Sequence, residues 1–427
     1  MESIKIGLLG FGTVGSGVYS ILEDNKDKIE SHIQKKLQIK KILVRDIGKQ
    51  RNVSVPAELF TTDVAEVIDD PEIDIVVELM GGIEPAGGYI RTAIENKKHI
   101  VTANKALIAT QGDEIYNLAC KNGVELRYEA SVGGGIPIIS TLTQSLAANN
   151  VDEICGIING TTNFILTQMD EQGMEFEEAL KLAQERGFAE ADPTSDIEGE
   201  DVAFKLAILI EVAFGIKLSP SEIPREGITK ISKRDIEFAK ELGYKIKLVA
   251  AARRKGNSLE YHVQPSFLPL ANPLASVNNE FNAVLVKGNA VGELLLYGKG
   301  AGSTPTGSAV LGDILEISKI IGTDYKAGAP LRNENKGFKL EGEGVSAYYV
   351  HMSAKDKPGV LGRITSAFGK YEVSLRSVIQ RSRGEDTVPL VFITHETERA
   401  RLDSALKEIE LSNDVSKIES VLRVEKK

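Results

Sequence analysis

The stretch Ile4-Lys5-Ile6-Gly7-Leu8-Leu9-Gly10-Phe11-Gly12-Thr13-Val14-Gly15 decides the fold of the N-terminal part of the chain. Residues 4–9 are an apolar strand, residues 10–15 follow the pattern Gly-x-Gly-x-x-Gly, and residues 14–29 have the periodicity of an amphipathic helix. Glycines let the backbone approach a pyrophosphate, and the free N–H groups of the helix attract its charge. In this context the motif predicts a dinucleotide-binding domain rather than a bare tight turn.

The second expected strand, residues 37–44, ends at Arg45-Asp46. An acidic side chain at this point is typical of a site that binds the ribose hydroxyls of NAD. A guanidinium is typical of a site that meets the 2′-phosphate of NADP. We therefore expect either NAD or NADP as the cofactor.

Two further strands are expected at residues 73–79 and 99–103, alternating with helical segments around residues 89–96 and 113–121. This alternation predicts a parallel sheet with helices on its faces. The second of these strands runs into Lys105, and ligands of open α/β sheets lie beyond the carboxyl ends of the strands. We expect Lys105 at the mouth of the site; the alternative is an ordinary surface lysine.

The next expected strand, residues 125–130, leads into Ser131-Val132-Gly133-Gly134-Gly135-Ile136-Pro137. Three glycines expose carbonyl oxygens, which are the ligands that a hard cation such as sodium prefers. The same glycines also permit a sharp turn out of the sheet. On the residues alone, a sharp turn is favoured over a cation site.

From residue 151 the pattern changes to that of an α+β substrate domain. A strand at residues 152–158 precedes the polar turn Asn159-Gly160-Thr161-Thr162-Asn163, whose side chains are typical of helix caps. The remaining expected elements are helices from residue 164 and over 176–186, strands at 245–253, 259–263, 281–286 and 293–297, and a helix over 306–321 that returns to the first domain.

The stretch from Gly187 to Ile210 carries the most chemistry. Five carboxylates crowd an irregular loop before the pattern turns helical and apolar at Asp201; they belong to Glu190, Asp192, Asp196, Glu198 and Glu200. Lys205 lies within the apolar run, one helical turn after Asp201, where loss of solvation would lower its pKa unless an anion is near. The pair predicts a proton-exchanging amine beside carboxylates, or else a buried ion pair or a lysine that reaches water.

The C-terminal part is expected to be a separate module. Residues 323–346 have little periodicity and are interpreted as a linker, and residues 348–427 follow the order β-α-β-β-α-β of a ferredoxin-like fold. The expected division is 1–136 with 303–322 for the nucleotide domain, 137–302 for the substrate and dimerisation domain, 323–346 for the linker and 347–427 for the last module.

Composition excludes several classes of protein. The chain has 427 residues, 42% hydrophobic and 26% charged, which is typical of two or three globular domains. A net charge of -10 argues against general binding to nucleic acid or anionic membranes. Without a leader pattern or a membrane span, a cytoplasmic protein is expected. Two cysteines and five scattered histidines favour neither a disulfide scaffold nor a zinc site.

These motifs resemble those of homoserine dehydrogenase along essentially the whole chain, with a C-terminal segment that is similar to an ACT domain. The resemblance rests on residues 10–15, 101–105, 156–163 and above all 187–205. It implies an α/β enzyme that interconverts L-homoserine and L-aspartate 4-semialdehyde with NAD or NADP. A homodimer or homotetramer is also expected.

The resemblance further implies roles for individual residues. Lys205 would exchange the proton, with Lys105 near the reacting centre and the cofactor. Glu190 and Asp201 would hold the amino acid, with Asp196 in support. The nucleotide contacts implied are Gly10, Phe11, Gly12, Thr13, Val14, Gly15, Arg45, Lys105, Gly187 and Gly302. The sodium site implied, ligated through main-chain oxygens, is Glu129, Val132, Gly134 and Ile136.

Three interpretations stay open at this point. The first is homoserine dehydrogenase, and the second is another nicotinamide-dependent amino-acid dehydrogenase, such as one acting on saccharopine or aspartate. The third is a non-catalytic sensor of dinucleotide and amino acid, which would not need Lys205. Threonine is the expected effector of the last module through Asp356-Lys357-Pro358-Gly359-Val360-Leu361, and a pure dimerisation module is the alternative.

Overall fold

The computed structural model describes residues 3–323, 338–380 and 387–426, which belong to two compact units. The first unit comprises residues 1–151, 204–222 and 282–336, and the second comprises residues 152–203, 223–281 and 337–427. Residues 204–222 fall in the first unit, and the C-terminal module falls in the second.

The first unit is built on a parallel sheet of six strands in the order β3-β2-β1-β4-β5-β6. The strands are β1 (Ser3–Leu9), β2 (Lys36–Leu43), β3 (Phe60–Thr61), β4 (Ile75–Glu78), β5 (His99–Thr102) and β6 (Leu126–Arg127). The strand order reverses between β1 and β4, and ligands bind at such a switch point in sheets of this kind. Ile6 and Leu8 of β1 are fully buried between the helical layers.

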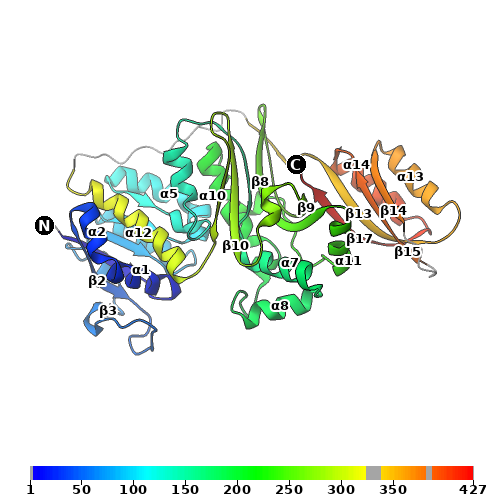
Figure 1. Ribbon diagram of the computed structural model, residues 1–427. Helices are drawn as coiled ribbons and strands as arrows, with labels where there is room; N and C mark the ends of the chain where they lie inside the picture. The colour runs from blue at the N-terminus through cyan, green and yellow to red at the C-terminus, as the bar shows by residue number, and fades with distance from the viewer. Residues whose placement is uncertain (1–2, 324–337, 381–386, 427) are drawn as a thin grey trace. The chain divides into compact units, whose positions relative to one another are not determined.

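Helices flank this sheet, and Figure 1 shows α12 lying against α1. The helices of the unit are α1 (Thr13–Asp24), α2 (Lys26–Ile33), α3 (Ala65–Ile68), α4 (Ala86–Glu95), α5 (Lys105–Asn122), α6 (Ile138–Ser140) and α12 (Ser303–Ile320). A Cβ on Gly17 of α1 would lie 2.1 Å from the Ser303 carbonyl oxygen, so glycine permits this close packing. The unit also holds the neighbouring strands β10 (Phe281–Gly288) and β11 (Gly292–Lys299).

The second unit contains strands in the order β7-β8-β9-β17-β13-β15-β14, with β12 beside β9 and β16 beside β13. Its strands are β7 (Val151–Ile157), β8 (Tyr244–Lys255), β9 (Ser258–Pro269), β12 (Lys339–Gly342), β13 (Val345–Lys355), β14 (Leu375–Gln380), β15 (Thr387–Thr394), β16 (Thr397–Glu398) and β17 (Val415–Val424). Its helices are α7 (Gly160–Gln172), α8 (Phe176–Glu185), α9 (Thr194–Ile197), α11 (Lys233–Glu241), α13 (Val360–Lys370) and α14 (Arg399–Glu410); α10 (Glu200–Phe214) begins here and continues into the first unit.

The C-terminal module has the predicted order β13-α13-β14-β15-α14-β17 and its own apolar core, which includes Tyr348, Phe368 and Phe392. It is not a free-standing appendage, because β17 pairs in parallel with β9 of the substrate domain through Arg423–Ser266 and Val424–Phe267. The two modules therefore share one sheet.

Three expectations about elements are corrected. The predicted helix over residues 14–29 is two helices, since α1 ends at Asp24 and α2 starts at Lys26. The predicted linker contains β12, which pairs with β9, while residues 324–337 of it lie outside the described residues. The helix expected from residue 164 begins at Gly160, because the Asn159 side chain caps it.

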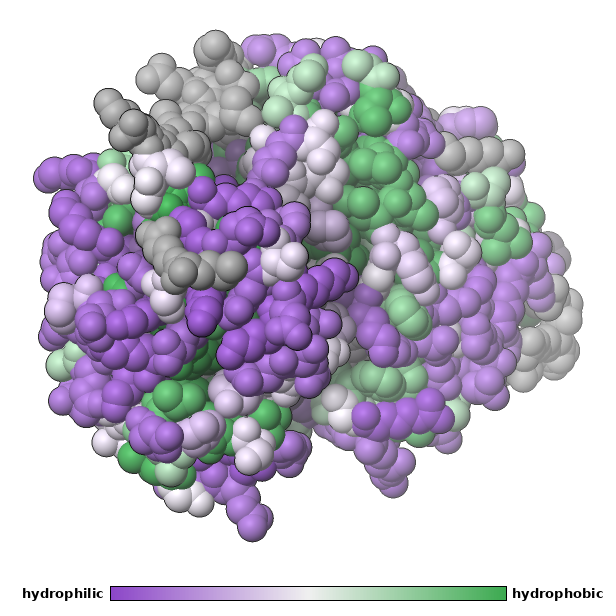
Figure 2. Space-filling view, turned by 60° about the vertical axis from the view of Figure 1, so that its left-hand side comes forward, coloured by the Kyte–Doolittle hydropathy of each residue, from purple (hydrophilic) through white to green (hydrophobic). Residues whose placement is uncertain are grey.

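In the described ranges, with gaps at 324–337 and 381–386, no helix is both long and apolar enough to cross a membrane. Figure 2 shows a surface that is hydrophilic over most of the visible face, with apolar side chains gathered in a few places.

Candidate active site

The glycine turn after β1 leaves an open approach to the backbone. Gly10 has a φ of +104°, and a Cβ there would lie 3.0 Å from the Leu79 carbonyl oxygen, so another residue would be strained. A Cβ on Gly12 would meet nothing within 4 Å, so this glycine faces open space. Gly12 caps α1 without a side-chain hydrogen bond, which leaves the N–H groups of the first turn, from Thr13 and Val14 onward, for an anion.

Arg45 lies two residues after the end of β2 and is exposed. The Gly10 N–H donates to the Leu43 carbonyl at 3.0 Å, which brings the end of β2 beside the first glycine. The Phe11 ring packs edge-on against Phe60 with centroids 5.5 Å apart. Arg45 therefore follows a strand end that borders the glycine turn.

A buried carboxylate, which sequence reasoning missed, organises the strand end near Lys105. Glu78 at the end of β4 is fully buried and accepts the Thr102 hydroxyl at 2.6 Å. The Asn104 amide donates to the Gly82 carbonyl at 2.6 Å, and its oxygen caps α5. Lys105 is the first residue of α5 and is partly buried. This network fixes the position at which Lys105 leaves the sheet.

The proposed cation loop is held by the side chain of Glu129. Its two carboxylate oxygens accept the N–H groups of Ile139 and Ser140 at 2.8 and 2.7 Å. The Glu129 N–H donates to Asp313 of α12 at 2.8 Å. The Glu129 carboxylate thus ties this loop to residues 139 and 140, and the Glu129 carbonyl oxygen accepts the Val132 N–H at 3.4 Å.

The carbonyl oxygens of Val132 and Gly134 accept no hydrogen bond from residues that the structure describes, whereas the Ile136 carbonyl accepts the Ile138 N–H at 2.8 Å. Asn282 is buried, and neither its Oδ1 nor its Nδ2 has a partner within the described ranges. A Cβ on Gly134 would lie 2.4 Å from the Gly300 carbonyl oxygen, and one on Gly300 would lie 1.7 Å from Asn282 Oδ1. This donor set of unpaired oxygens fits a hard cation.

The second unit brings two of the predicted carboxylates together on one amide. The Asn159 Nδ2 donates to Asp196 Oδ1 at 2.6 Å and to Asp201 Oδ2 at 2.9 Å. The Asn159 Oδ1 accepts the Thr162 N–H at 2.8 Å and so caps α7. Asp201 is buried and Asp196 is partly buried. A single side chain between β7 and α7 therefore orients both acids.

The other predicted residues of the acidic loop lie elsewhere. Glu190 is exposed, and among the described residues no hydrogen bond joins it to Asp196 or Asp201. Gly187 is exposed with a φ of +75°, and the Thr161 hydroxyl holds the following residue by donating to the Phe188 carbonyl at 2.6 Å. The loop is thus anchored at Phe188 and at the Glu190 carbonyl, which accepts the Gln184 side-chain amide at 3.1 Å, while the Glu190 residue is exposed.

Lys205 lies on α10, four residues after Asp201, as the helical pattern predicts. Its side chain is partly buried rather than fully buried, although Leu206 beside it is completely buried. Gly302, predicted to contact the cofactor, is the N-cap of α12 with a φ of +120°. Asp201 and Lys205 therefore share one helix, and Gly302 lies at a helix N-terminus.

Sequence reasoning missed the most buried lysine of the second unit. Lys247 of β8 donates to the Val277 carbonyl at 2.6 Å, Asn163 Oδ1 at 2.9 Å and Asn278 Oδ1 at 3.2 Å. Burial lowers the pKa of Lys247 to about 7. Its place in an apolar strand gave no signal, because the acceptors come from distant segments. Its hydrogen bond to Asn163 connects Lys247 to the last residue of the polar turn at residues 159–163.

Three family models match consecutive parts of the chain. The NAD binding domain of homoserine dehydrogenase matches residues 10–129, homoserine dehydrogenase matches residues 137–315, and the ACT domain matches residues 348–410. A curated homoserine dehydrogenase from Bacillus subtilis is 42% identical over 437 residues, covering 100% of this chain and 99% of the relative.

Solved structures agree with these matches. The crystal structure of a homoserine dehydrogenase from Thiobacillus denitrificans has a TM-score of 0.92 and 40% identity, covering 99% of this chain and 98% of that chain. A hyperthermophilic archaeal homoserine dehydrogenase in complex with NADPH has a TM-score of 0.62 and 28% identity, covering 74% of this chain and 98% of that chain.

Proposed function

The chain belongs to the homoserine dehydrogenase family, and we propose that Lys205 exchanges the proton of its reaction while the turn around Asp201 holds the amino-acid end of the substrate. The enzyme interconverts L-homoserine and L-aspartate 4-semialdehyde, and the bound nicotinamide cofactor supplies or accepts the hydride. Reduction of the aldehyde creates an alkoxide that needs a proton. A lysine ammonium can donate that proton to the C4 oxygen, and the amine takes it back in the reverse direction.

The observation that supports this proposal most is the double hydrogen bond from Asn159 to Asp196 and Asp201. An amide that donates to two carboxylates holds both of them in fixed positions. The substrate carries an α-ammonium group, which two oriented acids attract. Lys205 follows Asp201 by one turn of α10, and Asp196 on α9 is tied to Asp201 through Asn159.

The test is the rate of NADPH consumption with aspartate semialdehyde. Replacing Asp201 with Asn removes one charge at constant size, and we expect the KM for aspartate semialdehyde to rise by about tenfold or more. The KM for NADPH should change little. Glu185→Gln, an exposed carboxylate on α8, is the matched control. Equal effects on both substrates would contradict the assignment.

The Arg45 guanidinium is proposed to bind the 2′-phosphate of NADPH. The support is the exposed Arg45, which follows the strand end that borders the glycine turn, together with the relative that was solved in complex with NADPH. Arg45→Ala should raise the KM for NADPH and leave the KM for NADH nearly unchanged. If both constants change alike, the 2′-phosphate is not bound there.

A sodium ion is proposed at the loop after β6, held by main-chain oxygens of Glu129, Val132, Gly134 and Ile136. The support is the pair of unengaged carbonyls at Val132 and Gly134, and Asn282 Oδ1 offers a further oxygen. Replacing sodium by choline should lower the melting temperature of the parent more than that of Asn282→Leu. An identical response of both proteins would remove Asn282 from the site.

The C-terminal ACT domain is proposed to sense an amino acid such as threonine, in an enzyme that assembles as a homodimer or homotetramer. Residues 355–361, Gln380 and Leu390 line a pocket of about 350 Å³ that includes the predicted effector tract. Exposed apolar side chains offer a surface for assembly, namely Leu295 and Tyr297 on β11 and Val291 just before it.

A further inference from the structure

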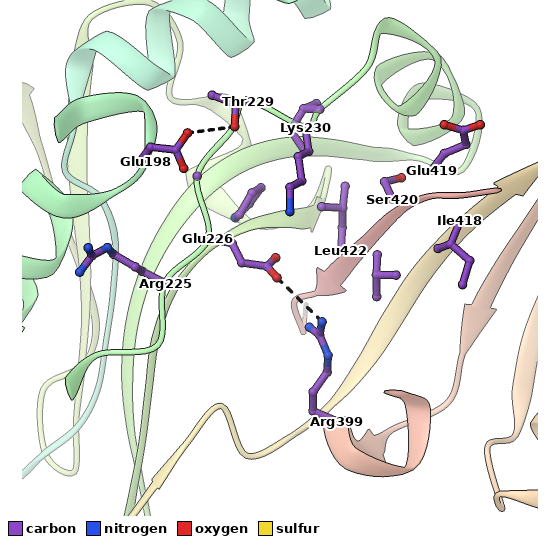
Figure 3. A pocket seen from close by; sticks show the side chains of 14 residues that line it. Glu198, Arg225, Glu226, Thr229, Lys230, Arg399, Ile418, Glu419, Ser420 and Leu422 are labelled. Atoms are coloured by element: carbon purple, nitrogen blue, oxygen red, sulfur yellow. Dashed lines mark hydrogen bonds and ion pairs between the residues drawn. The ribbon is translucent and has the colours of Figure 1, made fainter. Parts of the chain in front are cut away.

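A second pocket of about 470 Å³ lies inside the second unit, where the ACT domain meets the substrate domain. One wall is the loop of residues 225–231 with Glu198 of the acidic loop, and the other is Arg399 with residues 418–422 of β17. Figure 3 shows Lys230 and Glu226 of one wall and Arg399 of the other pointing toward one another. No residue of the proposed threonine tract lines this pocket.

The pocket holds charges of both signs that are incompletely paired. Lys230 extends into the pocket and has no hydrogen bond or ion pair with the residues described (Figure 3). Glu226 meets Arg399 only at 3.8 Å. Burial raises the pKa of the Glu226 carboxyl, and Arg399 only partly opposes this. The Glu198 carboxylate accepts the Thr229 hydroxyl at 3.0 Å. An additional cation near Glu226 and an additional anion near Lys230 would both be stabilised.

We propose that this pocket binds a small α-amino acid as a zwitterion, at a site separate from the tract at residues 356–361. The carboxylate of the ligand lies between Lys230 and Arg399, and its ammonium group faces Glu226. Ile418 and Leu422 offer apolar surface to the side chain. The volume is within the range of about 300–1,000 Å³ that is usual for small-molecule sites.

The pocket wall is packed directly against the loop that carries Asp196. The Ile228 N–H donates to the Ile197 carbonyl at 2.8 Å, and a Cβ on Gly227 would lie only 2.3 Å from that same carbonyl oxygen. Asp196 precedes Ile197 and is hydrogen-bonded to Asn159. A ligand that favours one position of residues 225–231 therefore biases the position of the substrate turn.

The experiment is calorimetric titration of the full chain with glycine, L-threonine, L-methionine and L-lysine. Propionate and propylamine, which each carry one charge, are the controls for the ligand. Lys230→Met and Glu226→Gln remove one charge each from the pocket. Lys357→Met removes a charge from the other pocket and is the matched control. Lys230→Arg keeps the charge.

We expect at least one of the amino acids to bind, and propionate and propylamine to bind at least tenfold more weakly. Lys230→Met and Glu226→Gln should weaken that binding about tenfold, which is about 1.4 kcal/mol, while Lys357→Met and Lys230→Arg retain it. Basal turnover should be the same in all four variants. The inference is overturned if none of the four amino acids binds, if both pocket variants bind normally, or if only Lys357→Met loses binding.

Discussion

At the scale of single residues, Lys205 carries the chemical proposal. Lys205→Ala should lower turnover by about 10² or more, because the alkoxide loses its proton donor. The dissociation constant for NADPH, measured by cofactor fluorescence, should stay nearly unchanged. Lys181→Ala, on the exposed face of α8, is the matched control. Turnover of Lys205→Ala within a few-fold of the parent would move the proton role to another group, with Lys105 first.

The residues of the site were only partly predictable from the sequence. The local pattern of acids in an irregular loop before an apolar helix indicated the region of Asp196 and Asp201, and the family resemblance implied their roles. Asn159 was expected only as a helix cap, because its carboxylate partners lie 37 and 42 residues further along the chain. Glu78 and Lys247 were not predicted for the same reason, because only the tertiary fold brings them together with their hydrogen-bond partners.

At the scale of elements, the packing of residues 225–231 on the acidic loop can be tested through Gly227. A Cβ at this position would lie 2.3 Å from the Ile197 carbonyl oxygen and 2.7 Å from the Glu198 Cα, so one backbone segment must move. Gly227→Ala should cost about 1–3 kcal/mol of unfolding free energy and raise the KM for aspartate semialdehyde.

The control for Gly227→Ala is Gly312→Ala in α12, where an added Cβ meets nothing within 4 Å. That variant should be neutral or slightly stabilising, because alanine favours the helix. Unfolding curves in urea and substrate kinetics are the measurements. A Gly227→Ala enzyme with parental stability and KM would show that the two loops are not tightly coupled.

Long periodic elements were predicted well, and short or context-dependent ones were not. The strands and helices of the ACT domain follow the predicted order because their alternation and turn residues are local signals. β12 lies in a segment without periodicity and exists because β9 offers it a partner. The helix α11 was missed, although Ser232 and Asp235 form a capping box, because its polar composition resembles a loop.

At the scale of the whole molecule, a buried charge network ties the end of the ACT domain to the substrate sheet. Glu425 pairs with Arg253 at 2.6 Å and with His262 at 3.2 Å; Glu425 and His262 are almost completely buried, and Arg253 is partly buried. Burial lowers the pKa of His262 to about 4, with the Glu425 hydrogen bond opposing it. His262 is therefore neutral in the native protein at neutral pH.

This network predicts a loss of stability in mild acid. Between pH 6.5 and about 4 the unfolded chain binds a proton at His262 that the native protein does not, so unfolding becomes easier as pH falls. The full contribution of that shift is about 3 kcal/mol. His262→Gln should flatten the change in urea midpoint between pH 6.5 and 4.5, and His32→Gln, at an exposed site, should not. Parallel pH profiles for the parent and His262→Gln would contradict the prediction.

The response to threonine cannot be isolated by removing the ACT domain, because this domain also stabilises the substrate sheet. Ending the chain near Asn333 would remove β17 from β9 and Glu425 from Arg253, and breaking such a buried pair costs about 3–5 kcal/mol. Loss of activity after truncation would therefore report stability as much as regulation. A single substitution in the full chain separates the two effects.

Gly359 is the position for that substitution, because its φ of +85° and a Cβ distance of 2.9 Å to Arg363 Nη1 disfavour any side chain. We expect millimolar threonine to lower the activity of the parent, and Gly359→Ala to reduce this response without changing the basal rate or the oligomer size measured by light scattering. If threonine changes neither activity nor oligomer size in the parent, the ACT domain is an assembly module. If the response persists in Gly359→Ala but is lost in Lys230→Met, the effector acts at the pocket beside Glu226, whose wall is hydrogen-bonded to the loop that carries Asp196.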